Sequence, residues 1–156
     1  MENICVIGVD YGTDSVRAVL VDAFTGEMLA SSVCNYPRWA RGLYCDPARS
    51  QFRQHPSDYV ESLETVLTDL ARQCPDAVRR VRALSVDATS STPCLVTVDC
   101  TPLALLPRYA DNPDAMFILW KDHTANRESE EITALCARSE PNYARHSGNH
   151  YSSECF

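Results

Sequence analysis

V-I-G-V-D-Y-G-T-D-S-V-R-A-V-L-V-D, residues 6–22, places a carboxylate, two hydroxyls and an arginine around one turn between two apolar strands. Burying such groups costs free energy unless another group pairs with them. The turn is therefore either a tight structural hairpin or a site for a polar, charged ligand. The strands on its two sides, at residues 4–10 and 15–22, fix the start of the fold.

A third strand follows closely and makes the beginning of the sheet antiparallel. Residues 22–26 form a turn, and residues 27–36 read as a strand that ends at Pro37. Because all three strands are joined by short connections, the sequence predicts an antiparallel meander.

A helix and a further strand come next and predict a parallel crossover. The helix has start signals at His55-Pro56 and stops at Pro75, with Pro favoured in the first turn. An apolar stripe recurs at steps of three and four residues: Val60, Leu63, Val66, Leu67, Leu70 and Cys74. The strand at 81–86 then lies parallel to a neighbour in the same sheet.

The remaining segments extend this α/β pattern. We predict a loop over 38–53, a strand at 95–98 with a turn at 99–102, and a proline-containing loop at 108–114. A strand at 115–120 leads to a helix from Asp122 or Thr124 to Ala137, and its buried stripe is Ile132, Leu135 and Cys136. The predicted fold class is therefore α/β with a mixed sheet.

Composition and charge restrict the class of protein. At 156 residues the chain has the length of one domain, with 45% hydrophobic and 22% charged residues, which fits a soluble globular protein. The net charge of −7 does not indicate a nucleic-acid-binding protein, because such proteins carry a basic surface. No apolar run approaches the roughly 18 residues of a membrane helix, and no signal peptide is evident. We expect a cytoplasmic protein without nucleic-acid or membrane partners.

The cysteines and histidines do not form a convincing metal motif. None of the eight cysteines makes a C-x-x-C pair, so we expect reduced packing residues. His146 and His150 have helical metal spacing, but Pro141 and Gly148 argue against a regular helix there. We therefore predict no metal site at these histidines.

The turn at 12–15 lacks the known helix-based phosphate signatures. Neither G-x-G-x-x-G nor G-x-x-x-x-G-K-[ST] occurs, and a strand follows the turn. An anion can instead bind backbone amides of the turn, the hydroxyls of Thr13 and Ser15, and the fork of Arg17. Asp10 would then hold a hydrated Mg²⁺. In the structural alternative, Asp10 caps the turn, Gly12 supplies a positive φ, and Arg17 is a surface residue.

The stretch G-V-D-Y-G-T-D-S-V-R-A, residues 8–18, resembles the first phosphate motif of the FGGY carbohydrate kinases, which belong to the actin/hexokinase/Hsp70 ATPase superfamily. The similarity extends over residues 3–154, and further strings follow in the order seen in bacterial L-ribulokinases. These are P-R-W (37–39), S-Q-F-R-Q-H-P (50–56), V-D-A-T-S-S-T-P (86–93), N-P-D-A-M-F-I-L-W-K-D-H-T-A (112–125) and Y-S-S-E (151–154).

The resemblance implies a fold, a reaction and cofactors. The fold would be the actin/hexokinase-like, RNase H-like N-terminal ATPase domain, with an antiparallel meander and parallel strands from helical crossovers. The reaction would be ATP-dependent phosphorylation of a ketopentose, L-ribulose to L-ribulose 5-phosphate in arabinose catabolism, with ATP and Mg²⁺ as cofactors. The partners would be sugar and ATP, and the full-length family member would be able to form a homo-oligomer.

The same resemblance assigns residues. Asp10 matches the metal-linked aspartate, acting through water. The phosphate contacts would be Gly12, Thr13, Ser15 and Arg17, and the sugar would face Ser90, Ser91, Trp120 and Asp122. The small Ser90 leaves room for a five-carbon ketose. Structural alternatives stay open for Trp120 as a core residue and for Asp122 as a helix N-cap.

The resemblance also implies that part of the machinery lies elsewhere. In the family the general-base aspartate and the adenine pocket belong to a much longer chain, and Asn149 and Cys155 depart from its pattern. We therefore expect residues 1–156 to be a single, incomplete FGGY-type N-terminal domain without the C-terminal nucleotide domain, inactive alone.

Two other classes of function stay open. The first is a non-catalytic sugar- or phosphate-binding fragment or decayed gene product. The second, weaker, is a nucleic-acid processing domain of the related RNase H-like fold, in which Asp10 and Asp87 would offer two carboxylates to metals.

Overall fold

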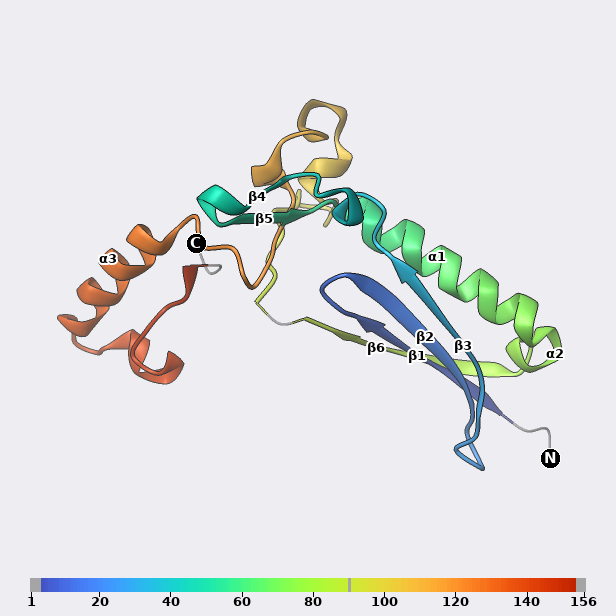
Figure 1. The fold of residues 1–156 in the computed structure, drawn as a ribbon. Helices are drawn as coiled ribbons and strands as arrows, with labels where there is room; N and C mark the ends of the chain where they lie inside the picture. The colour runs from blue at the N-terminus through green and yellow to red at the C-terminus, as the bar shows by residue number, and fades with distance from the viewer. Residues whose placement is uncertain (1–3, 90, 154–156) are drawn as a thin grey trace. The chain divides into compact units, whose positions relative to one another are not determined.

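The computed structural model describes residues 4–89 and 91–153 and divides into two compact units (Figure 1). Unit 1 consists of Met1–Gly42 and His55–Thr89, and unit 2 consists of Leu43–Gln54 and Ser90–Phe156. Each unit is described by itself.

A four-stranded mixed sheet forms the centre of unit 1. Its order is β3-β2-β1-β6, with β1 at Cys5–Tyr11, β2 at Ser15–Asp22, β3 at Met28–Asn35 and β6 at Val81–Ala88. β2 is antiparallel to both β1 and β3, whereas β6 is parallel to β1. The antiparallel meander and the parallel crossover predicted from the sequence are therefore confirmed.

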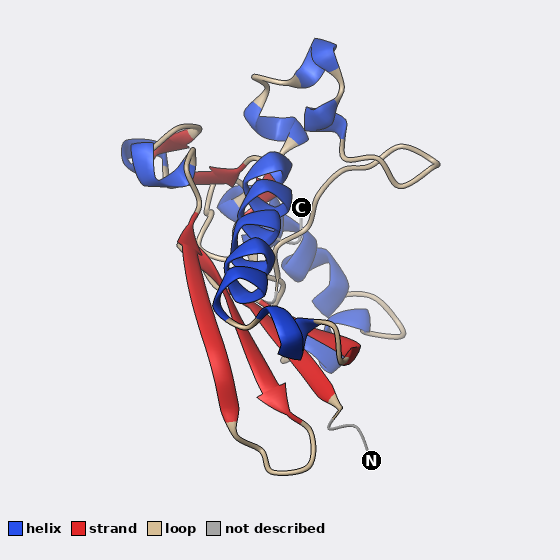
Figure 2. Cartoon of the chain, turned by 90° about the vertical axis from the view of Figure 1, so that its right-hand side faces the viewer, coloured by secondary structure: helices blue, strands red, loops and turns tan. Residues whose placement is uncertain are grey.

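The helix α1 (Pro56–Gln73) covers one face of this sheet, where it packs on β2 and β3, and the short α2 (Pro75–Val78) follows it (Figures 1 and 2). Its N-cap is His55, whose Nδ1 accepts the Ser57 amide at 3.1 Å. The buried residues that α1, α2 and the first three strands share are Cys5, Ile7, Val9, Val16, Ala18, Leu20, Ala30, Tyr36, Val66, Leu70 and Ala77.

The prediction that Val60 belongs to the buried stripe of α1 was wrong. Val60 is exposed, and the inward position in that turn belongs to Ser62. The stripe that faces the sheet follows Ser62, Val66 and Leu70 at intervals of four, which turns Val60 away from the core.

Unit 2 contains a small antiparallel sheet of β4 (Cys45–Asp46), β5 (Gln51–Gln54) and β7 (Phe117–Ile118). The prediction of a loop over 38–53 was therefore wrong for β4 and β5, and the strand predicted at 115–120 is shorter. The described 3₁₀ helices of the two units are η1 Trp39–Arg41, η2 Pro47–Arg49, η3 Leu103–Leu105, η4 Pro107–Tyr109, η5 Pro113–Ala115 and η6 Tyr143–Ser147.

The prediction of a strand at residues 95–98 was also wrong. Only an isolated bridge joins Val96 to Pro102. The chain closes into a tight turn, in which the Thr97 amide donates to the Thr101 carbonyl at 2.9 Å and Cys100 has a φ of 63°. The hydroxyls of Thr97 and Thr101 both donate to the Asp99 carboxylate, which completes the turn and leaves no extended segment to pair.

The last long helix, α3 (Asn126–Ala137), starts later than predicted. Asp122 and Thr124 form a separate turn before it, because the Asp122 carboxylate accepts the Thr124 amide. The predicted buried position of Leu135 was wrong, since its side chain is exposed. The residue that α3 buries is Ser129, whose hydroxyl donates to the Tyr151 carbonyl at 3.1 Å.

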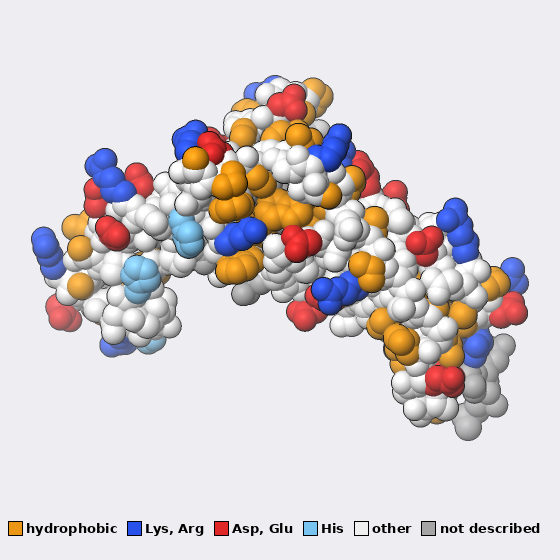
Figure 3. All heavy atoms as spheres, viewed as in Figure 1, with side chains coloured by type: hydrophobic (Ala, Val, Ile, Leu, Met, Phe, Trp, Pro, Cys, Tyr) orange, Lys and Arg blue, Asp and Glu red, His pale blue; other side chains and the backbone are white. Residues whose placement is uncertain are grey.

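On the face drawn in Figure 3, acidic and basic side chains are interspersed rather than gathered by sign. Over residues 4–89 and 91–153, no helix is both long and apolar enough to cross a bilayer. The seven cysteines of that part form no disulfide with one another, and Cys5 is buried, but Cys100 is exposed and is therefore not a packing residue.

Candidate functional site

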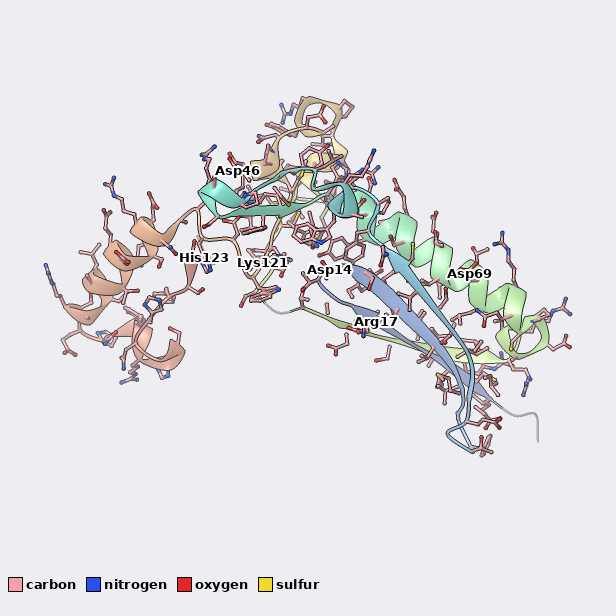
Figure 4. All side chains as sticks on the ribbon, viewed as in Figure 1. Asp14, Arg17, Asp46, Asp69, Lys121 and His123 are labelled. Carbon is pink, nitrogen blue, oxygen red and sulfur yellow. The ribbon has the colours of Figure 1, made fainter. Side chains whose placement is uncertain are left out.

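The β1–β2 hairpin places Asp10 and Arg17 opposite each other. They are Cα partners in the antiparallel register, and a guanidinium nitrogen of Arg17 lies 3.8 Å from a carboxylate oxygen of Asp10. Val9, Val16 and Ala18 are buried on one face of the sheet. Because side chains alternate along a strand, Asp10 and Arg17 lie on the other face. Figure 4 shows Arg17 projecting from β2 away from α1, which carries Asp69.

A third charged residue joins this pair from β6. Asp87 is the Cα partner of Asp10 in the parallel β1–β6 register. Together with Gly8, Val9, Val19 and Ser85, these three charged residues line a cleft of about 370 Å³ on the sheet. Two carboxylates and one guanidinium therefore share one open hollow.

The sequence interpretation gave Asp87 no role at this cleft. It named the residue as a second carboxylate only in the nucleic-acid alternative. The signal was nevertheless available, because two parallel neighbouring strands that both end in Asp must bring these carboxylates to the same edge of the sheet.

The turn itself differs from both sequence interpretations. Gly12 does not have a positive φ, which contradicts the structural alternative. The amide of Gly12 donates to the Ser15 carbonyl at 2.9 Å, so this amide closes the hairpin and is already engaged. A Cβ on Gly12 would lie 3.3 Å from that same carbonyl oxygen, so any larger residue requires the turn to shift by a few tenths of an ångström.

Two aromatic residues fix the turn from outside the hairpin. The Tyr36 hydroxyl donates to the Gly12 carbonyl at 3.1 Å, and the Tyr36 amide donates to the Asp14 carbonyl at 3.0 Å. The Trp39 indole donates to the Asp14 carboxylate at 2.6 Å. Tyr36 is fully buried and stacks on Tyr59, and burial raises the pKa of its phenol above the ordinary value. The turn is therefore held in one conformation before any ligand arrives.

The segment that carries these aromatics is itself anchored to α1 by Asp58. This fully buried carboxylate accepts the backbone amides of Arg38 and Trp39 and a guanidinium nitrogen of Arg38, all within 3.2 Å. A second carboxylate, Glu61, also accepts the Arg38 guanidinium, and this hydrogen bond lowers the pKa of Glu61. The chain of contacts thus runs from α1 through Trp39 to the hairpin.

The two predicted hydroxyl contacts differ in accessibility. Thr13 is half-buried, whereas Ser15 is only 7% exposed. The structure brings Asp10, Gly12, Thr13, Ser15 and Arg17 to one end of the sheet, as one continuous hairpin must.

The predicted sugar-facing residues belong to unit 2, except that Ser90 lies outside the described residues. Ser91 is exposed and has a left-handed backbone with a φ of 51°. Trp120 is 48% exposed, which contradicts the alternative that it is a core residue. Beside it, the Lys121 ammonium lies 4.7 Å from the centroid of the Phe52 ring.

Asp122 is the buried centre of a polar network. Its Oδ2 accepts the Phe52 amide at 2.8 Å and the Arg53 Nε at 2.7 Å, and its Oδ1 accepts the amide and hydroxyl of Thr124. Burial would raise the pKa of Asp122, but the hydrogen bonds from Thr124, Phe52 and Arg53 outweigh it and lower that pKa.

This network corrects one alternative for Asp122. The N-cap of α3 is Ala125, so Asp122 does not cap that helix. Both carboxylate oxygens are engaged within the protein, which gives Asp122 a structural role joining β5 to the segment after β7. A direct contact of Asp122 with sugar stays a prediction.

The cleft residues fit a magnesium ion held partly by a ligand's phosphates. Mg²⁺ prefers oxygen donors and is usually bound by one or two carboxylates plus phosphates and water. Asp10 is half-exposed toward the cleft, with Asp87 as its neighbour. Among the described residues, no group of three acidic, histidine or cysteine side chains could hold a metal alone, so phosphate and water would have to complete the shell.

Curated relatives of this chain are ribulokinases. The chain is 45% identical over 153 residues to a ribulokinase of Vibrio parahaemolyticus, covering 97% of this chain and 27% of the relative. It is 34% identical to a ribulokinase of Halalkalibacterium halodurans, covering 95% and 27%. No protein-family model matches the chain. The chain thus spans about a quarter of the length of the curated relatives it matches.

The fold also matches solved sugar kinases. A crystal structure of a xyloylose kinase from Brucella ovis superimposes with a TM-score of 0.73 at 18% identity, covering 96% of this chain and 27% of that chain. At this identity the similarity shows the fold alone. It confirms the predicted actin/hexokinase-like ATPase fold, with its mixed sheet of antiparallel and parallel strands.

Proposed function

We propose that the chain is the N-terminal part of an FGGY-type carbohydrate kinase and that it serves ATP-dependent phosphorylation of a ketopentose, L-ribulose to L-ribulose 5-phosphate; its similarity to ribulokinases supports this. The substrates are a small sugar and ATP. The proposal treats residues 1–156 as one incomplete FGGY-type N-terminal domain, with the nucleotide domain in the part of the kinase that this chain does not match.

The cleft at the ends of β1, β2 and β6 carries this proposal. Arg17 stands 3.8 Å from Asp10 there, on a hairpin that Tyr36 and Trp39 hold in place. Preorganised donors stabilise developing charge well, because they need no rearrangement during the reaction. A rigid polar hairpin open to solvent is therefore suited to the phosphate end of a kinase site.

Each cleft residue has a defined task in this proposal. Arg17 binds a phosphate oxygen with its planar fork, and its ion pair with Asp10 places the two side chains at the same cleft. Thr13 and Ser15 supply hydroxyl donors on the same hairpin. Asp10 holds Mg²⁺ through water, and the bound Mg²⁺ would neutralise charge on the transferred phosphoryl group.

The sugar side of the proposal rests on unit 2. The half-exposed ring of Trp120, together with Ser90 and Ser91, would face the ketopentose. Asp122 keeps the Trp120 segment joined to β5 through its bonds to Phe52 and Arg53. The general base that takes the proton from the sugar hydroxyl would be an aspartate beyond the matched part, so the chain alone would be inactive.

The cellular setting follows the same reasoning. We place the protein in the cytoplasm and in arabinose catabolism, and the seven free cysteines of the described residues are in keeping with a reducing compartment. Any homo-oligomer would belong to the complete kinase.

A chimera tests this function. This chain would replace the matching part of the Vibrio parahaemolyticus ribulokinase, and release of ADP would be measured with L-ribulose and Mg·ATP. We expect the chimera to phosphorylate L-ribulose and the chain alone to show no turnover. A folded chimera that phosphorylates no ketopentose would contradict the proposal in favour of a non-catalytic fragment. Turnover by the chain alone would contradict the placement of the base.

A further inference from the structure

Asp14 brings a second negative charge to the hairpin that carries Arg17. Residues 10–17 contain two carboxylates and one guanidinium, and Asp14 stands between Thr13 and Ser15 in the chain. Figure 4 labels Asp14 at the turn of the hairpin and Arg17 further along β2. A carboxylate at this turn repels any phosphate that binds to the neighbouring hydroxyls.

The Asp14 side chain is also a competitor for the donors of its own turn. Aspartate side chains in turns readily accept hydrogen bonds from backbone amides a few residues away. The hydroxyls of Thr13 and Ser15 lie directly beside it in the chain. An Asp14 side chain that rotated freely would therefore oppose phosphate binding in two ways, by its charge and by occupying donors.

Two residues of the segment after β3 remove this freedom. The Tyr36 amide donates to the Asp14 carbonyl at 3.0 Å, which fixes the backbone. The Trp39 indole donates to the Asp14 carboxylate at 2.6 Å, which fixes the side chain. A hydrogen bond to a charged acceptor is stronger than one between neutral groups. In this conformation, the described lining of the charged cleft includes Asp10 and Asp87 but not Asp14.

The indole of Trp39 has a rigid support. The Trp39 amide donates at 3.1 Å to the carboxylate of Asp58, which is fully buried on α1. The same carboxylate accepts a guanidinium nitrogen of Arg38 at 2.8 Å. The Trp39 side chain also packs against the core of unit 1, whereas Asp14 is exposed. Trp39 therefore supplies the fixed position that the exposed carboxylate lacks.

We propose that Trp39 is a positioning residue for phosphate binding, because its indole holds the Asp14 carboxylate away from the phosphate. Thr13, Ser15 and Arg17 then remain the groups that meet the anion. The inference rests on the proposed function, which places the phosphates of ATP at this hairpin. It differs from a purely structural role, because the effect of losing the indole depends on the charge of Asp14.

A double-mutant cycle in the chimeric kinase tests this dependence. Trp39→Phe keeps an aromatic ring but removes the donor, and it should raise KM for Mg·ATP by roughly tenfold with little change in kcat or in KM for L-ribulose. In an Asp14→Asn background the same substitution should no longer raise KM for Mg·ATP, because the repelling charge is gone. In an Asp76→Asn background, which removes an equal charge from an exposed position on α2, the full effect should remain.

Proton NMR of the 156-residue chain tests the contact without catalysis. Trp39→Phe assigns the two indole signals, because it removes one and leaves that of Trp120. Asp14→Asn should then move the Trp39 indole proton upfield and leave the Trp120 signal in place, since the acceptor loses its charge. Circular dichroism checks that each variant is folded.

Three results would overturn the inference. They are an unchanged KM for Mg·ATP in Trp39→Phe, an equal rise of this KM in the Asp14→Asn background, and a Trp39 indole signal that does not respond to Asp14→Asn. An active wild-type chimera with any of these results leaves the proposed function standing. An inactive wild-type chimera contradicts the proposed function and the inference with it.

Discussion

Asp122 is a predicted sugar-contact residue whose buried environment gives it a structural role. It is almost fully buried, and its carboxylate binds Arg53, which is itself buried. The same guanidinium also contacts Asp114 at 3.3 Å, but that carboxylate is 80% exposed. One arginine therefore provides a buried pair and an exposed pair for direct comparison.

We predict that Asp122→Asn lowers the free energy of unfolding by about 3 kcal/mol or more, because it leaves the Arg53 charge buried without its counter-charge. Asp114→Asn should cost less than about 1 kcal/mol, since exposed pairs are weak. Urea denaturation of both variants measures the difference. Equal small losses would show that the Asp122–Arg53 pair does not stabilise unit 2.

The lowered pKa of Asp122 also sets a direction for acid stability. Because the pKa is lower in the folded than in the unfolded protein, its stabilisation is present above the unfolded value of about 3.9. It is lost as the pH falls through the folded value. The free energy of unfolding should therefore fall more steeply below pH ~4 in the wild type than in Asp122→Asn. Parallel curves for the two proteins would contradict this prediction.

Tyr36 makes the corresponding contribution in unit 1. Tyr36→Phe removes the hydroxyl that donates to the Gly12 carbonyl and should lower the free energy of unfolding by about 1–2 kcal/mol. Tyr143→Phe changes an exposed tyrosine and should have little effect. Thermal denaturation compares the two. A loss no larger than that of the control would mean that Tyr36 does not hold the turn.

Among the elements, the β1–β2 hairpin depends on a close backbone approach at one glycine. Gly12→Ala would place a Cβ 3.3 Å from the Ser15 carbonyl oxygen and should destabilise the protein by about 1 kcal/mol or more. Gly8→Ala adds a methyl at ordinary contact distance, 3.4 Å from Val19, and serves as the control. Equal unfolding midpoints for the two variants would show that the turn can relax around the added Cβ.

Elements defined by local patterns were predictable from the sequence. The meander of β1, β2 and β3 follows from apolar runs joined by short turns, and α1 follows from its start signal and stripe. Parallel pairing of β6 with β1 follows from the crossover. For the meander and for α1, the residues that decide the element lie close together in the chain.

Elements that depend on distant contacts were not predictable in this way. β5 is a polar segment, Gln51–Gln54, that becomes a strand through pairing with β7, more than sixty residues later. α3 starts late because Asp122 accepts hydrogen bonds from Phe52 and Arg53 as well as from Thr124. The anchors of the site, Tyr36 and Trp39, likewise contact the hairpin from outside the motif that identified it.

At the scale of the whole molecule, each unit carries its own set of predicted site residues. Unit 1 carries the charged cleft and its rigid hairpin, and unit 2 carries Trp120 and the Asp122 network. The matched region makes up 27% of the length of the Vibrio parahaemolyticus ribulokinase.

The central claim is that the cleft at Arg17 holds the phosphates of ATP, and steady-state kinetics of the chimeric kinase test it most directly. Arg17→Ala should lower kcat/KM for ATP by roughly a hundredfold, and Arg17→Lys should restore part of this loss because the charge remains without the fork. Arg72→Ala, an exposed arginine on α1, should leave kcat/KM unchanged. Wild-type kcat/KM in Arg17→Ala, or an equal loss in Arg72→Ala, would contradict the claim.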